Sequence, residues 1–254
     1  MMRYLAGCLS LLLLAPCAPA TAQENVDLEL ILMADGLGSV DDNEFILQRM
    51  GHVQALRHPT ILRAIRGGRR GRIALSYVEW SGDDLHVPIV PWTVIHARQD
   101  IEAFAAKLET HPRELYGGGT ALGDAILYGM QSLKTNRFDA PRLVIDLSGD
   151  EPDRNGLDAV VGRDKAVAAR VAINGLPILD GWPGLDRFFY DNVIGGPGAF
   201  VESARGFKDV YYAVRRKMIR EISALPPPAK TPTKISAQIA KQINTKQINR
   251  GKQP

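Results

Sequence analysis

The order of apolar and polar residues predicts strands and helices that alternate along most of the chain. Apolar runs with the length of buried strands fall at residues 28–34, 72–80, 142–147 and 171–178, with a short last strand at 199–202. Between them, apolar residues recur every three or four positions, which is typical of one helix face. The first face comprises Ile46, Met50, Val53 and Leu56, and later helices are expected around 101–108, 122–130, 158–170 and 207–218.

One pair of strands differs from the rest. Residues 81–84 (Ser-Gly-Asp-Asp) predict a turn between the strand at 72–80 and a second strand at 86–95. Pro88 and Pro91 in the second strand cannot donate ladder hydrogen bonds, which places that strand at a sheet edge. Strands that alternate with helices otherwise form a parallel sheet covered on both faces. The sequence therefore predicts a doubly wound α/β domain with a mostly parallel central sheet and one antiparallel edge hairpin.

The two ends of the chain differ in composition from its body. Residues 1–22 combine Arg3, a short apolar core and a small-residue site ending at Ala22, which predicts a signal peptide and a periplasmic or secreted protein. The apolar core is too short for a transmembrane segment. Residues 225–254, rich in Pro, Lys and Gln, predict a disordered basic tail. The domain is expected to span 23–224.

The positions of the cysteines and the distribution of charge argue against further classes of function. Cys8 and Cys17 both lie in the predicted signal, so the mature chain has no disulfide and no thiol ligand. The formal net charge is +3, but seven of the 31 basic residues and none of the 28 acidic ones lie in the two ends. The body is therefore mildly acidic, which argues against a nucleic-acid-binding fold.

Three loops deserve scrutiny because ligands of doubly wound sheets bind at the carboxyl ends of the strands. They cover residues 35–41, 117–121 and 148–156. Their candidate groups are carboxylates and hydroxyls, which suit Mg²⁺, Mn²⁺ or Ca²⁺ better than zinc or copper. Taken singly, Asp35, Ser39 and Thr120 also fit helix N-caps, so the residue types alone leave both interpretations open.

The strings Asp-Gly-Leu-Gly-Ser at 35–39, Gly-Gly-Gly-Thr at 117–120 and Val-Ile-Asp-Leu-Ser-Gly-Asp at 144–150 resemble the von Willebrand factor type A domain. The chain also resembles an uncharacterised bacterial, secreted branch of that family, over roughly residues 26–222. In the family these loops form a metal-ion-dependent adhesion site (MIDAS), with the pattern Asp-x-Ser-x-Ser, a distant Thr and a distant Asp. The resemblance implies metal ligands at Asp35, Ser39, Thr120 and Asp150.

Two departures from the family pattern bear on this site. Leu37 stands where the family has its first serine and has no lone pair to give, so the site is expected to be weakened or lost. Loss of one ligand corresponds to about tenfold or more in affinity, about 1.4 kcal/mol per tenfold. Glu151 stands where a glycine commonly follows the family's aspartate and adds a carboxylate. The resemblance implies a non-enzymatic protein-interaction module with a degenerate MIDAS, in which a partner's acidic side chain completes the metal site. The alternative is a metal-free interaction module.

Other functions have weaker support in the sequence. It contains no G-x-S-x-G, H-E-x-x-H or P-loop motif. A divalent-metal phosphoesterase built on Asp35, Asp146 and Asp150 is conceivable, although Asp146 lies inside a predicted strand and reads as hydrogen-bonded structure. Residues 117–120 lack the pattern of a nucleotide-binding loop, and 153–158 lack the bidentate glutamate of a calcium loop. The five histidines are interpreted as surface or capping residues: His52, His58, His86, His96 and His111.

Overall fold

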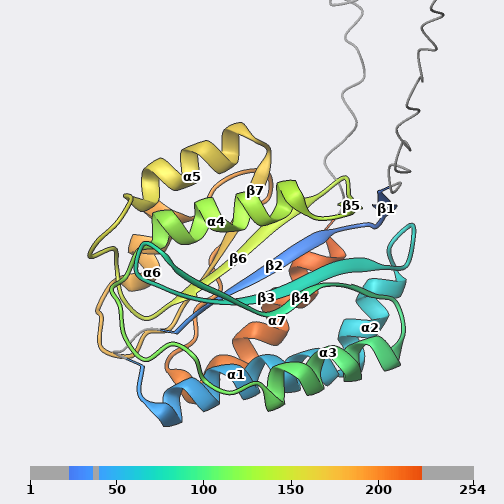
Figure 1. The fold of residues 1–254 in the computed structure, drawn as a ribbon, viewed down its shortest axis with the longest axis horizontal. Coiled ribbons are helices and arrows are strands. Elements are labelled where there is room, and N and C mark those ends of the chain that lie inside the picture. Colours follow the sequence, from blue (N-terminus) through green and yellow to red (C-terminus); the bar gives the residue numbers. More distant parts are fainter. Residues whose placement is uncertain (1–22, 37–39, 225–254) are drawn as a thin grey trace, which may run out of the picture.

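The computed structural model of the chain describes residues 23–36 and 40–224. Its centre is a five-stranded sheet with the order β4-β3-β2-β6-β7 (Figure 1). The strands are β2 (Glu29–Asp35), β3 (Ile73–Ser81), β4 (Leu85–Ile95), β6 (Leu143–Gly149) and β7 (Val171–Pro177). All neighbours are parallel except β4, which pairs antiparallel with β3 at the edge. The predicted fold class, including the edge hairpin, is confirmed.

Helices cover both faces of the sheet (Figure 1). One layer contains α1 (Asp42–Arg57), α2 (Pro59–Arg66), α3 (Arg98–Thr110) and α7 (Val210–Ser223), and the other contains α4 (Leu122–Thr135), α5 (Ala159–Ala168) and α6 (Leu185–Phe188). Successive side chains of a strand point to opposite faces. Leu30 and Leu32 therefore join the core beneath the first layer, whereas Ile31 and Met33 join the core beneath the second.

Shorter elements complete the fold. Strands β1 (Glu24–Asn25) and β5 (Phe138–Asp139) form a small parallel pair, and the turns η1 (Phe189–Val193) and η2 (Phe207–Asp209) connect β7 to α7. The predicted strand at 199–202 is present only as an isolated bridge between Gly175 and Val201, and a second bridge joins Ile178 to Ala204 beyond its predicted end. The amide of Phe200 bonds instead to the side chain of Asn174, so a regular ladder does not form there.

Local signals explain where the first helices begin. Asp41 accepts hydrogen bonds from the amides of Asn43 and Glu44, while the Glu44 side chain accepts one from the Asp41 amide. This reciprocal capping box satisfies donors of the first turn and starts α1. Pro59 occupies the first turn of α2 behind the N-cap His58, because a proline there removes no helical hydrogen bond.

The predicted inner face of α1 needs correction. Val53 and Leu56 are buried as expected, but Ile46 is 55% exposed. The inward face also carries Gln48, Arg49 and His52, all buried. Gln48 bonds to the carbonyl of Asp35 and Arg49 to Glu79 on β3, whereas His52 bonds to the carbonyl of Gln48 within the helix. The helix is therefore rotated away from the position that its apolar residues alone indicate.

The predicted signal peptide (1–22) and tail (225–254) lie outside the described residues, and their boundaries stay predictions. Within the described part of the chain, no helix combines the length and apolar character needed to cross a bilayer.

Candidate functional site

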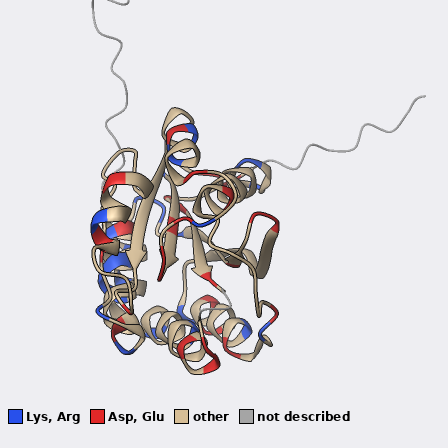
Figure 2. Cartoon of the chain, turned by 90° about the vertical axis from the view of Figure 1, so that its left-hand side faces the viewer, with Lys and Arg blue, Asp and Glu red and all other residues tan. Residues whose placement is uncertain are grey.

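The carboxyl ends of the adjacent strands β2 and β6 bring two aspartates together. Asp35 is the last residue of β2 and Asp150 directly follows β6. The strands are parallel neighbours in register, so the two residues emerge at the same edge of the sheet. A hydrogen bond joins their side chains, and both residues are buried. Seen onto this edge, acidic residues lie at the strand tips and on the surrounding loops (Figure 2).

Burial and neighbouring charge shape the electrostatics of this pair. Burial raises the pKa of Asp150 above its ordinary value, and the negative charge of Glu151 raises that pKa further. The hydrogen bond to Asp35 acts in the opposite direction. Ionised carboxylates only accept hydrogen bonds, so two carboxyl groups can share one only through a proton. A bound cation in place of that proton would satisfy both groups.

Thr120, in the loop 117–121, contacts the loop 148–156 that contains Asp150. Its buried hydroxyl lies 3.3 Å from Oε2 of Glu151, the residue after Asp150. The carbonyl of Thr120 accepts hydrogen bonds from the amides of Arg154 and Asn155. The loops 117–121 and 148–156 are therefore bonded to each other as well as adjacent.

Glycines allow this close packing of the loops. A Cβ on Gly119 would collide with the amide side chain of Asn155, and one on Gly118 would collide with the hydroxyl of Ser81. Gly118 also has φ +109°, a backbone conformation that disfavours other residues. The run of three glycines thus lets the backbone enter the space between the β3–β4 turn and the 148–156 loop.

Helix α1 holds the site from behind. The Gln48 side chain donates to the carbonyl of Asp35 over 2.6 Å and accepts from the hydroxyl of Ser148 over 3.2 Å. One buried amide therefore fixes the ends of both strands that carry the aspartates. Gln48 was not identified from the sequence, since a single polar position in an amphipathic helix gives no signal of its partner.

A buried ion pair supports the neighbouring strand. Arg49 contacts Oε1 of Glu79 on β3 over 2.7 Å and also donates to the carbonyl of His111. Burial raises the pKa of Glu79, an effect that the positive charge of Arg49 opposes. This pair ties α1, β3 and the segment leading to Thr120 into one support.

The position of Thr120 excludes its interpretation as a helix N-cap. Helix α4 begins after Ala121, and its first amide, that of Leu122, is bonded to Oδ1 of Asp153 over 2.8 Å. The other carboxylate oxygen of Asp153 accepts from the amide of Ala159 at the start of α5. Asp153 thus bonds to the first turns of two helices at once, and Asp158 is the N-cap of α5.

The residues at this edge fit a hard divalent cation. The carboxylates come from Asp35, Asp150 and Glu151, and a hydroxyl comes from Thr120. Asp35 is hydrogen-bonded to Asp150, and Thr120 to the adjacent Glu151. Over the residues that the structure describes, no group of three His, Cys, Asp or Glu side chains has the arrangement of a metal site, so such a site would also depend on hydroxyl ligands. Ser39 and Leu37 lie outside the described residues, and their roles stay predictions.

Asp146 is separate from this edge. It lies inside β6 and pairs with Lys217 Nζ over 2.6 Å, both side chains being buried. The predicted structural role of Asp146 is confirmed, and the three-aspartate centre of a phosphoesterase is not assembled. Among the histidines, His58 is a helix cap as predicted, whereas His52 is buried and bonded to the carbonyl of Gln48, contrary to prediction.

Comparison with known protein families assigns the chain to a family of unknown function. A model of the family described as "Protein of unknown function (DUF1194)" matches residues 25–226 of the chain. The search of curated protein sequences found no match.

Several solved structures share the fold at low sequence identity. Proximal thread matrix protein 1 from the mussel byssus, solved with a zinc-occupied MIDAS motif, is 17% identical with a TM-score of 0.56, covering 80% of this chain and 50% of that one. The pilus adhesin SpaC from Lactobacillus rhamnosus GG is 12% identical with a TM-score of 0.56, over 79% and 31%. A von Willebrand factor type A protein from Catenulispora acidiphila is 14% identical with a TM-score of 0.55, over 78% and 43%. The chain therefore spans half or less of each of these proteins and shares with them the von Willebrand A fold.

Proposed function

We propose that this chain, which belongs to the DUF1194 family and has the fold of a von Willebrand A domain, is a secreted or periplasmic protein-interaction module and not an enzyme. One observation carries the proposal. Asp35 ends β2, Thr120 and Asp150 come from two separate loops, and the three converge at the carboxyl edge of the sheet. The partner docks on the loops 35–42, 117–121 and 148–156.

A divalent cation is part of the proposed mechanism. Asp35, Asp150 and Thr120 would hold it, with Ser39 as a further ligand expected from the sequence. The ion, Mg²⁺ or alternatively Mn²⁺ or Ca²⁺, would supply an electron-poor centre that attracts a carboxylate of the partner protein. The zinc-occupied MIDAS motif of the mussel thread protein supports a divalent ion at this place in the fold. Leu37 is expected to make the site weaker than one with both serines.

The arrangement of the remaining polar groups favours binding over catalysis. Asp153 is engaged by two helix N-termini and Asp146 by Lys217, so neither is available to bind a metal or transfer a proton at the edge. Gln48 and Arg49 support the backbone of the site from inside the fold. What remains at the edge is a group of buried oxygen atoms on Asp35, Thr120 and Asp150, which suits coordination of a cation and, through it, recognition of the group that the cation attracts.

The first experiment is a calorimetric titration of Mg²⁺, Mn²⁺ and Ca²⁺ into the chain from residue 23 to 254. We expect saturable binding that weakens at least tenfold in Asp150→Ala. Asp139→Ala is the matched control, because Asp139 is exposed and lies on β5, away from this edge. If no ion bound in the millimolar range, the proposed cation site would be wrong, and the alternative of a metal-free interaction module would stand.

A second experiment separates the interaction module from an enzyme. A photo-crosslinker placed at Tyr116, which is 69% exposed in the segment leading to Thr120, should capture a partner in secreted extracts with Mg²⁺ but not with chelator. Capture that persists with chelator would favour metal-free docking. Turnover of phosphate esters that Asp35→Asn abolishes would instead identify an enzyme and overturn the proposal.

A further inference from the structure

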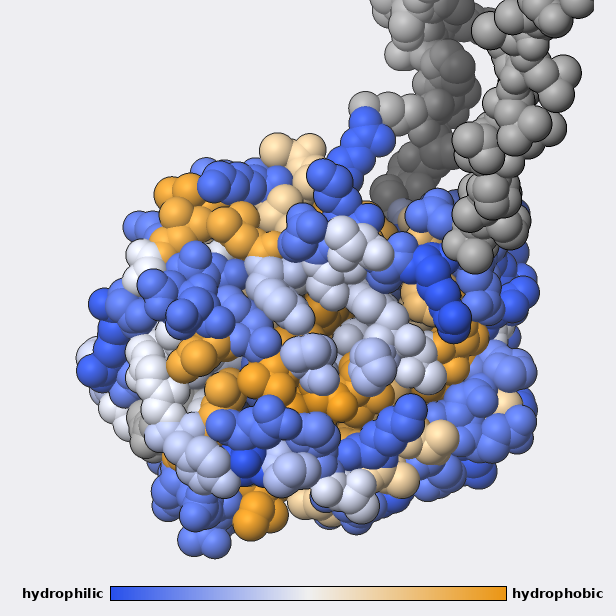
Figure 3. All heavy atoms as spheres, viewed as in Figure 1, coloured by the Kyte–Doolittle hydropathy of each residue, from blue (hydrophilic) through white to orange (hydrophobic). Residues whose placement is uncertain are grey.

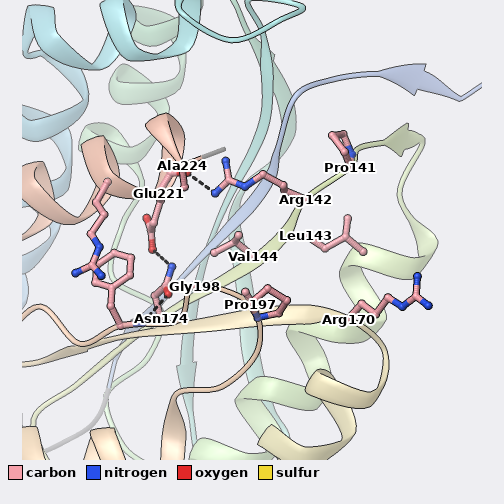
Figure 4. Close-up of a pocket in the computed structure, with 13 residues that line it drawn as sticks. Pro141, Arg142, Leu143, Val144, Arg170, Asn174, Pro197, Gly198, Glu221 and Ala224 are labelled. Carbon is pink, nitrogen blue, oxygen red and sulfur yellow. Dashed lines mark hydrogen bonds between the residues drawn. The ribbon is translucent and has the colours of Figure 1, made fainter. Parts of the chain in front are cut away.

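The opposite edge of the sheet, where the parallel strands begin, contains two adjoining hollows. The first, of about 570 Å³, lies between the starts of β6 and β7 and the end of α7 (Figure 4). The second, of about 850 Å³, lies between the end of α2, residues 67–70 and the end of α7. Pro141, Arg142 and Ala224 line both hollows, so the two form one continuous surface.

Arginine is the dominant charged residue of this surface. Six arginines line the hollows: Arg63, Arg69, Arg70, Arg142, Arg170 and Arg220. Three carboxylates accompany them: Asp27, which is bonded to the amide of Arg70, Glu221, which is paired with Lys217 inside the fold, and the exposed Asp139. The surface therefore has an excess of positive charge, although the body of the chain is mildly acidic overall.

Three of these arginines are accessible to an anion from solution. Arg63, Arg69 and Arg170 are exposed, and within residues 23–36 and 40–224 none of them forms an ion pair. Most other exposed arginines of the domain pair with a carboxylate, such as Arg98 with Glu102. Unpaired guanidinium groups around a hollow favour an anion, and phosphate is one that arginine binds with two hydrogen bonds.

The first hollow adds apolar walls to this charge. Leu143, Val144, Ala172 and Phe200 line it. Arg142 reaches across the hollow to the carbonyl of Glu221 at the end of α7 (Figure 4), and the guanidinium of Arg220 lies 3.7 Å from the ring centre of Phe200. The surface thus combines fixed cations with apolar contact area, which suits an amphiphile with an anionic head.

The position of the chain ends decides between possible occupants. Ala224, the last residue that the structure describes, lines both hollows. The segment that follows, 225–254, contains six basic and no acidic residues, so its charge opposes docking into an arginine-lined surface. Strand β1, where the described chain begins, lies at the same end (Figure 1), and hydrophilic residues surround this end (Figure 3). The arginines therefore present positive charge at the end of the molecule where Ala224 lies.

We infer that this edge docks the protein on an anionic phospholipid surface. Headgroup phosphates bind the arginines of the two hollows, and the basic tail adds further attraction. Each Lys or Arg near such a surface contributes about fivefold in partitioning. Docking in this orientation turns the carboxyl edge, with Asp35 and Asp150, away from the membrane and toward a partner.

The test measures sedimentation of the chain from residue 23 to 254 with vesicles of phosphatidylglycerol and phosphatidylcholine, and with pure phosphatidylcholine vesicles. We expect binding only to the anionic vesicles, weakening as salt rises. The triple variant Arg63→Gln, Arg69→Gln, Arg170→Gln should bind at least tenfold more weakly. The matched control Lys107→Gln, Arg205→Gln, Lys208→Gln neutralises three other exposed basic residues and should change binding less than twofold.

Further arms identify the source of the anion and the part played by the tail. A chain that ends at Ala224 should bind more weakly but keep its dependence on the three arginines. Equal binding of the arginine variant and the parent, with both folded by thermal melting, overturns the inference, as does loss of all binding on removing the tail. Arginine-dependent binding to heparin or duplex DNA that exceeds vesicle binding, or full displacement by millimolar inorganic phosphate, would identify a soluble anion and also overturn it.

Discussion

Strand β6 and the residue directly after it provide two aspartates with opposite environments. Asp146, inside the strand, contacts Lys217 Nζ over 2.6 Å, and the same ammonium contacts Glu221 over 2.8 Å. Asp150, four positions later, shares a hydrogen bond with another carboxyl group, that of Asp35. A carboxylate with an internal ammonium partner contributes to the fold. A carboxyl pair at a sheet edge, beside a hydroxyl, is suited to a cation from solution.

The largest expected effect comes from removing the ammonium group of Lys217. Lys217→Met leaves Asp146 and Glu221 buried without it, and removal of one partner from a buried ion pair typically costs about 3–5 kcal/mol. We expect a loss of this size in the free energy of unfolding, measured by urea denaturation.

A control variant tests whether the loss of stability comes from the unpaired negative charge of Asp146 and Glu221. Adding Asp146→Asn and Glu221→Gln to Lys217→Met removes the stranded carboxylates and should recover much of the loss. A single variant within about 1 kcal/mol of the parent would show that Lys217 does not neutralise the core acids, and the contrast with the edge pair would fail.

The second prediction concerns pH. Burial, followed by the charge of Asp146, raises the pKa of Glu221 from its ordinary value of 4.5 to about 7. The folded state then holds a proton that the unfolded state releases, so the free energy of unfolding falls as pH rises from about 4.5 to about 7 and levels off above. The shift corresponds to about 3 kcal/mol.

Glu221→Gln tests this by removing the titrating group. Urea denaturation at several pH values should show a flatter profile for the variant between pH 5 and 7, so that the parent loses stability relative to it across this range. Parallel profiles would mean that Glu221 is ionised in the folded state throughout, as a simple ion pair with Lys217 would require.

The third prediction applies the contrast to the edge. A saturating cation that binds only the folded state adds about 2.7 kcal/mol at a hundred times its dissociation constant. Addition of Mg²⁺ should therefore raise the melting temperature of the parent, and Asp150→Asn should abolish this rise. Asp146→Asn should lower the melting temperature with and without Mg²⁺ but keep the rise. If both variants lost the Mg²⁺ response, Asp146 would belong to the site after all.

The sequence predicted those parts of the molecule that depend on regular repetition. Continuous apolar runs are typical of strands buried on both faces, and apolar spacing along the helices follows from backbone geometry, so the layered sheet could be predicted. Parallel strands also present their carboxyl ends at one edge, which is why the meeting of Asp35 with Asp150 was predictable.

Contacts between distant side chains were beyond this reasoning. Gln48 and Arg49 face inward on α1 because they bond to the carbonyl of Asp35 and to Glu79, whereas the spacing of apolar residues predicted Ile46 on that face. The double cap at Asp153 exists because α4 and α5 begin side by side, a fact that depends on the path of the loop. The two arginine-lined hollows likewise combine residues from six separate parts of the chain.

The smallest predicted effect concerns Leu37, which stands at a usual serine ligand position. If the edge pair of aspartates belongs to a weakened cation site, Leu37→Ser adds an oxygen ligand and should tighten Mg²⁺ binding about tenfold, or about 1.4 kcal/mol, in calorimetry. Leu37→Ala is the matched control, since it removes the same apolar side chain without adding a hydroxyl. Equal affinities of the Ser and Ala variants would mean that the hydroxyl is not a ligand, and the site would then rest on the aspartates and Thr120 alone.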